Sequence, residues 1–99
     1  MSSPTARLSS ATTGHGCWPS TNICEASETV IAGGLLVACV SHAAIPHQCV
    51  VLPYPIHGLS VASGSGSVIT EGLSAARLGD SMSCGDTIAE GFPTVIIGD

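Results

Sequence analysis

Short apolar runs interrupted by glycine set the pattern of this 99-residue chain. Residues 30–40 and residues 68–78 each begin with a Val-Ile pair, pass through a glycine-containing turn and continue as small and aliphatic residues. That pattern is typical of a β-hairpin, with the turns at Gly33-Gly34 and Glu71-Gly72. Because no segment keeps a helical period, we predict an all-β chain of short strands and hairpins.

The two predicted hairpins match each other in register, which indicates an internal repeat. A third copy begins at Val95-Ile96 and lacks its second half. The missing half stands near the N-terminus, where Thr5-Ala6-Arg7-Leu8 matches Ala75-Ala76-Arg77-Leu78. We therefore predict that the first and last half-units lie side by side and close a ring with pseudo-threefold symmetry. The strand edges of so small a structure must be covered, which favours a partner at its base.

Loops are predicted where proline, serine and glycine gather. Pro46, Pro53 and Pro55, together with residues 60–67, indicate exposed turns rather than the interiors of strands. The chain as a whole fits one domain, residues 1–99, with a modest core. Its twelve glycines raise the entropy cost of folding, and domains with so lean a core commonly need a disulfide, a metal or a partner subunit.

The charge of the chain excludes one class of partner. Two basic residues stand against seven acidic ones, a net charge of −5, so no basic patch exists to neutralise the phosphates of a nucleic acid. No apolar stretch approaches the roughly 20 residues that span a bilayer. The N-terminus lacks the basic and apolar regions of a secretory signal, so we expect synthesis in the cytoplasm without a signal peptide.

Cysteine and histidine side chains predict a metal site. The five cysteines are odd in number and form no Cys-x-x-Cys pair, so metal binding explains them better than a disulfide framework does. Counted from the repeat position of Arg7, Cys39 and Arg77, a ligand-type residue follows after seven or eight residues each time. These residues are His15, His47 and Cys84.

A fourth candidate, His57, precedes glycine as His15 and Cys84 do. Structural zinc sites are usually tetrahedral with four Cys and His ligands, so we predict a site of His15, His47, His57 and Cys84. Cys49 competes with His47, since either side chain can point inward. Zinc is the metal that these ligands favour, and iron is the alternative.

The other metal-capable residues have simpler interpretations. Cys17, Cys24 and Cys39 are expected to lie outside the site, and His42 takes the repeat position of Asp80 as a turn residue. No acidic residue stands at a spacing such as His-Glu-x-x-His, and so small a chain offers little pocket. We therefore predict neither an enzyme nor a small-molecule substrate.

Several of these motifs resemble those of the PAAR-repeat proteins, the tips of contractile injection machines. The tetrapeptide that names the family corresponds to Pro4-Thr5-Ala6-Arg7, Ser74-Ala75-Ala76-Arg77 and, in degraded form, Leu36-Val37-Ala38-Cys39. The family's His-Gly, Pro-x-His-Gly and closing Cys-Gly patterns correspond to His15-Gly16, Pro55-Ile56-His57-Gly58 and residues 84–95. The resemblance covers essentially the entire chain, and the departures, Cys39 and His42, lie in the middle repeat.

This resemblance implies a small cone with pseudo-threefold symmetry and a zinc ion at its vertex, bound by three histidines and one cysteine. The ligands carried over by position are His15, His57 and Cys84, with His47 as the second. The implied partner is a trimeric β-helical spike, one tip per trimer, and the target membrane is contacted transiently. Arg7 and Arg77 are implied to be structural.

The implied function is a membrane-piercing tip, located at a virion tail tip or the tip of an injection apparatus and made in a bacterial cytoplasm. A phage tail, a type VI secretion apparatus and another contractile system fit the sequence equally. A stand-alone zinc-binding module without a spike partner is the alternative from a different class.

Overall fold

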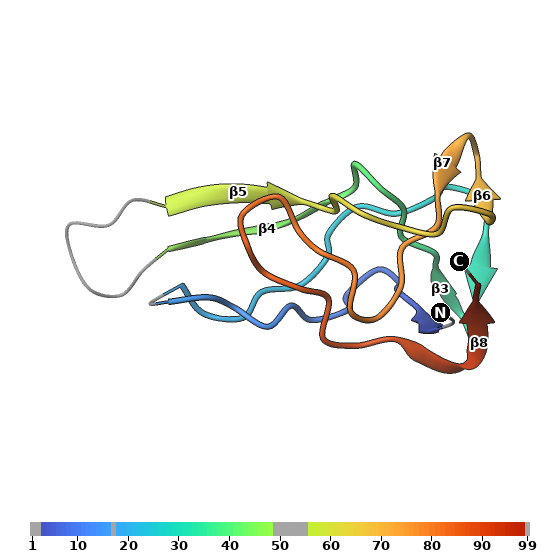
Figure 1. The fold of residues 1–99 in the computed structure, drawn as a ribbon, viewed down its shortest axis with the longest axis horizontal. Helices are drawn as coiled ribbons and strands as arrows, with labels where there is room; N and C mark the ends of the chain where they lie inside the picture. The colour runs from blue at the N-terminus through green and yellow to red at the C-terminus, as the bar shows by residue number, and fades with distance from the viewer. Residues whose placement is uncertain (1–2, 17, 49–55, 99) are drawn as a thin grey trace.

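The computed structural model describes residues 3–16, 18–48 and 56–98, and every regular element in them is a β-strand (Figure 1). The strands are β1 (Ser3–Thr5), β2 (Ile31–Ala32), β3 (Leu35–Leu36), β4 (Ala43–Gln48), β5 (Ile56–Ser60), β6 (Ile69–Thr70), β7 (Leu73–Ser74) and β8 (Phe92–Ile97). The described residues include no helix of the length and apolarity needed to cross a membrane. The prediction of an all-β chain is confirmed.

Both predicted hairpins form, β2 with β3 and β6 with β7. Their turns have positive φ at both central residues, 60° and 88° at Gly33 and Gly34, and 52° and 82° at Glu71 and Gly72. This is the type I′ geometry that matches the right-handed twist of paired strands. Glu71 adopts it without being glycine, and its carboxylate accepts hydrogen bonds from the hydroxyl groups of Ser27 and Thr29, each at 2.5 Å.

The third unit is assembled from the two ends of the described chain. β1 pairs with β8 in antiparallel fashion, with Pro4 opposite Ile96. Ile31 opposite Leu36 and Ile69 opposite Ser74 occupy the same places in the two hairpins. The predicted side-by-side arrangement of the first and last half-units is therefore what the structure contains.

A cyclic set of backbone hydrogen bonds joins the three units. The amide of Ala6 donates to the carbonyl of Ala76 at 3.0 Å, Ala76 donates to Ala38 at 2.9 Å, and Ala38 donates to Ala6 at 3.0 Å. All three alanines have no exposed surface. Since each donates to one member and accepts from the other, these residues, called here the alanine ring, mark the pseudo-threefold axis.

The residue after each ring alanine holds the turn that follows. The backbone amides of Arg7, Cys39 and Arg77 donate to a side chain three residues on. The acceptors are Ser10 Oγ, His42 Nδ1 and Asp80 Oδ2. In the middle unit, His42 therefore accepts the same backbone hydrogen bond that Asp80 accepts in its unit, as its position in the repeat predicts.

At two of these positions, the arginine side chains donate hydrogen bonds to backbone carbonyls of a neighbouring unit. The Arg7 guanidinium donates to the carbonyls of Ala32 and Gly33, both at 3.1 Å, and Arg77 donates to the carbonyl of Gly98 at 3.2 Å. Arg7 also lies over the ring of Phe92, 4.3 Å from its centroid. Both arginines therefore tie neighbouring units together.

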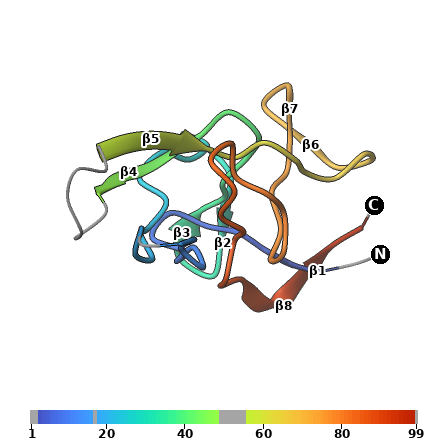
Figure 2. The ribbon, with the colours of Figure 1, turned by 60° about the vertical axis from the view of Figure 1, so that its left-hand side comes forward.

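The molecule has a broad end and a narrow end. Strands β1, β2, β3, β6, β7 and β8 gather at one end with both termini of the described chain, and the β4–β5 hairpin extends toward the other (Figure 1). In the turned view, β1 lies beside β8 near the two termini (Figure 2). The main core lies between them and includes Ile23, Val61, Met82 and Ile88, all at most 3% exposed.

The long hairpin corrects one expectation about loops. Pro46 lies inside β4 rather than in a turn. A strand in a two-stranded sheet leaves one edge unpaired, and the register shifts between Ala44 and His47, so the missing amide of proline breaks no required hydrogen bond. Pro53 and Pro55 lie outside the described residues.

The alanine ring predicts an equal cost at three sites far apart in sequence. Ala6→Leu, Ala38→Leu and Ala76→Leu should each lower the free energy of unfolding by about 1–3 kcal/mol, because a larger side chain overpacks the axis. Ala62→Leu, at an exposed position, is the matched control and should change it little. Urea unfolding with zinc present measures all four. A ring variant as stable as the control would contradict the assignment of the axis.

Candidate metal centre

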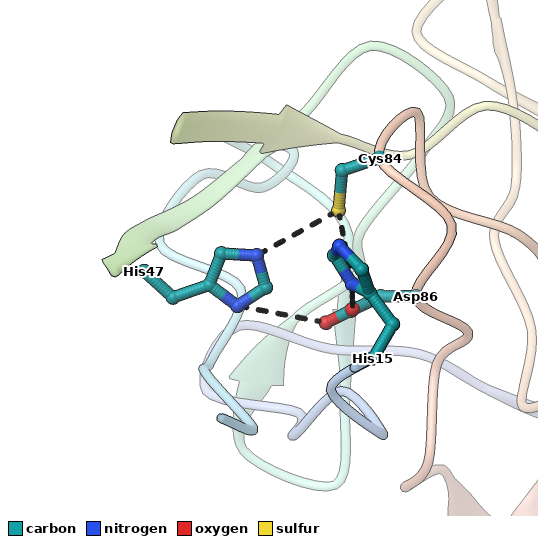
Figure 3. A group of neighbouring side chains, drawn as sticks. All are labelled: His15, His47, Cys84 and Asp86. Atoms are coloured by element: carbon teal, nitrogen blue, oxygen red, sulfur yellow. Dashed lines mark hydrogen bonds and ion pairs between the residues drawn. The ribbon is translucent and has the colours of Figure 1, made fainter. Parts of the chain in front are cut away.

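Four metal-capable side chains from three parts of the chain meet beside the β4–β5 hairpin (Figure 3). They are His15, His47, Cys84 and Asp86, and one ligand atom from each lies within 4.8 Å of the others. His47 and Asp86 are buried, whereas His15 and Cys84 are partly exposed. Solvent therefore reaches the group only in part.

A tight turn places His15. The backbone amide and carbonyl of His15 exchange hydrogen bonds with those of Trp18, at 3.0 and 2.8 Å. Gly14 precedes the turn at φ +75°, where an added Cβ would lie 2.8 Å from the Trp18 carbonyl oxygen, so a side chain is excluded there. The indole ring of Trp18 stacks on the imidazole, with 5.2 Å between centroids, and limits how the ring can tilt.

His47 lies in β4 with only 4% of its surface exposed. Its Nδ1 donates to the carbonyl of Pro19 at 2.8 Å, and its Nε2 lies 3.8 Å from Cys84 Sγ. A carbonyl oxygen can only accept a hydrogen bond, so Nδ1 carries the proton of the neutral ring. The lone pair is then on Nε2, the nitrogen that faces the cysteine.

The segment Cys84-Gly85-Asp86 supplies the other two side chains. Gly85 has φ +106°, a conformation that strains other residues, and its amide donates to the carbonyl of Met82 at 3.3 Å. This turn lets both the thiol of Cys84 and the carboxylate of Asp86 face the two histidines (Figure 3). Cys84 Sγ lies 4.0 Å from His15 Nδ1.

Asp86 is fully buried and well hydrogen-bonded. Its Oδ2 accepts from the hydroxyl of Thr12 at 2.6 Å and from the amide of Gly14 at 3.2 Å, while Oδ1 contacts His15 Nδ1. Burial by itself would raise the pKa of this carboxyl group. The hydrogen bonds from Thr12 and His15 and the nearby imidazoles outweigh burial and hold the pKa below its ordinary value.

The donor set fits a zinc-type ion. Zn–S and Zn–N bonds of tetrahedral sites place a sulfur and a nitrogen ligand about 3.5 Å apart. The distance of 3.8 Å from Cys84 Sγ to His47 Nε2, the nitrogen that carries the lone pair, is close to that value. Two histidines and a thiol are borderline and soft ligands, which suit zinc better than magnesium or calcium.

Three of the four ligands predicted from sequence therefore come together: His15, His47 and Cys84. His57 lies in β5 with its backbone opposite His47, but its side chain, like the whole of Cys49, is outside the described part of the structure. Cys17 also lies outside it. The choice between His47 and Cys49 stays a prediction.

Three other metal-capable residues lie outside the group, as expected from the sequence. Cys24 and Cys39 are free thiols outside the group, and His42 is occupied by the turn at Cys39. Sequence reasoning missed Asp86 as a neighbour of the site. Its signal was an acidic residue two positions after a predicted cysteine ligand, across a glycine.

The chain matches the model of a known protein family. A family model described as the PAAR motif matches residues 13–90, which include all four members of the group. No curated protein matches the chain.

The geometry predicts which histidines matter for metal. Changing His15 to Ala, His47 to Ala or Cys84 to Ser removes a donor, so zinc affinity should fall by more than the roughly 10–100-fold typical of losing a partner outside the ligand shell. His42→Asp is the matched control, because aspartate at the equivalent position 80 supports the same turn. Chelator competition followed by metal analysis measures the effect. Undiminished zinc in the three ligand variants would refute the site.

Proposed function

The chain belongs to the PAAR-motif family, structural spike-tip proteins of contractile injection systems, and from this we propose that it is a metal-stabilised, membrane-piercing tip. Its broad end caps a trimeric β-helical spike, with one tip per trimer. Its narrow end is held together by zinc, with iron as the alternative. A phage tail and a type VI secretion apparatus remain equal settings for this role.

The observation that carries the proposal is a threefold set of exposed isoleucines. Ile31, Ile69 and Ile96 occupy equivalent places in β2, β6 and β8 and are 63%, 57% and 53% exposed. These strands lie together at the broad end (Figure 1). Exposed apolar side chains arranged in this way favour a partner, and a trimer can present the same complementary surface to each of them.

The metal's role in this proposal is mechanical. The ligands are His15, His47, His57 and Cys84, which come from widely separated parts of the sequence. An ion bound to them would tie the first loop, the β4–β5 hairpin and the segment before β8 into one point, so its binding energy would contribute directly to folding. A zinc ion in such a structural site is bound by four protein ligands and needs no open coordination position.

The family is structural rather than enzymatic, so we propose no chemistry on a substrate for this chain. At the front of a spike, the proposed tip would contact the target membrane only transiently, while the membrane is being pierced.

Mixing the purified chain with a trimeric spike fragment tests the proposal. Size-exclusion chromatography with light scattering should give a stable complex of three spike chains and one tip. Ile31→Asp should weaken this complex at least tenfold, about 1.4 kcal/mol, because it places an unpaired charge in an apolar interface.

Ile45→Asp is the matched control, since Ile45 is similarly exposed (52%) but lies in β4, and it should leave the complex unchanged. Zinc binding without binding to any such spike would instead support the stand-alone metal-binding module. Equal weakening by both variants would show that the broad end is not the docking face.

A further inference from the structure

Asp86 has no role in the ligand set predicted from sequence, yet it is completely buried beside it. A carboxylate in such a place is costly unless its oxygens are hydrogen-bonded. Thr12 and Gly14 donate hydrogen bonds to Oδ2. Oδ1 contacts His15 Nδ1, and His47 Nδ1 lies 3.9 Å from Oδ2 (Figure 3). Each oxygen therefore has an assigned partner within the protein.

The contact between Asp86 Oδ1 and His15 Nδ1 determines which nitrogen of the imidazole carries the proton. An ionised carboxylate only accepts hydrogen bonds, so the proton of neutral His15 lies on Nδ1 and its lone pair lies on Nε2. His47 is in the same state, because its Nδ1 donates to the carbonyl of Pro19. The two rings are thus set to the same tautomer by acceptors that differ in kind, a carboxylate and a backbone carbonyl.

We propose that Asp86 is the positioning residue of the metal centre. By accepting the Nδ1 proton of His15 it fixes the tautomer and orientation of that ring, so that Nε2 is the nitrogen available to zinc. This inference rests on the metal-binding role proposed above and adds a residue outside the ligand set. Such carboxylate partners of zinc-binding histidines typically contribute a factor of 10–100 in metal affinity.

Asp86 is itself held by a chain of hydrogen bonds. The backbone amide of Thr21 donates to Thr12 Oγ1 at 3.1 Å, and the hydroxyl of Thr12 donates to Asp86 Oδ2. Thr12 is 1% exposed, so little water reaches this chain. Thr12→Val should consequently weaken zinc binding in the same direction as a change at Asp86, but less.

Asp86→Asn in the full chain tests the proposal through zinc affinity, measured by competition with a chromophoric chelator. Affinity should fall 10–100-fold. Asp80→Asn is the matched control: Asp80 is also a buried carboxylate, but it pairs with Arg77 and lies outside the metal-capable group. The loss at Asp86 should exceed the loss at Asp80 by at least tenfold, and equal losses would overturn the proposal.

A second measurement needs no variant and is insensitive to folding defects. Long-range ¹⁵N NMR of the zinc-loaded wild-type chain should show His15 bound through Nε2 with a protonated Nδ1. Zinc bound through Nδ1, or an oxygen ligand from Asp86 seen by X-ray absorption, would overturn the positioning role. A wild-type chain that binds no zinc would instead refute the proposed metal site itself, so the two failures are distinguishable.

Discussion

The structure depends on three backbone hydrogen bonds among the buried alanines 6, 38 and 76. Each alanine belongs to a different unit, and each donates to one neighbour while accepting from the other, so removing any unit would leave buried polar groups unpaired. The three alanines have no exposed surface, so a larger side chain would overpack the point where the three segments meet. This constraint explains why alanine occupies the same repeat position three times in a chain with few bulky residues.

The ring also relates the two ends of the molecule. The strands that precede the ring, β1, β3 and β7, pair with the strands that expose Ile96, Ile31 and Ile69. The segments that follow the ring lead to His15, His47 and Cys84. One set is threefold and apolar, as a trimeric partner requires. The other converges on one point, as a metal requires. A single axis therefore relates the proposed docking face to the proposed metal centre, where we propose that Asp86 positions His15.

Much of this arrangement could be predicted because it follows local rules. The type I′ turns follow from Gly33-Gly34 and Glu71-Gly72, and the pairing of β1 with β8 follows from the repeat. Pro46 was wrongly expected in a loop because strand edges cannot be read from a sequence. Asp86 was missed because its contacts depend on a turn at Gly85 and on a carboxylate meeting a histidine 71 residues away. Spacing identified His15, His47 and Cys84 as neighbours, which the structure brings together. The ligand set itself, with His57 as the fourth member, stays a prediction.

Because the energy of metal binding would contribute directly to folding, the alanine ring and the proposed metal centre should unfold as one cooperative unit. Native-state hydrogen exchange of the amides of Ala6, Ala38 and Ala76, with zinc bound and after chelation, measures whether they do. We expect all three amides to exchange only through global unfolding, with one shared free energy of opening that falls equally for all three when zinc is removed. Three different free energies, or values that chelation leaves unchanged, would contradict it.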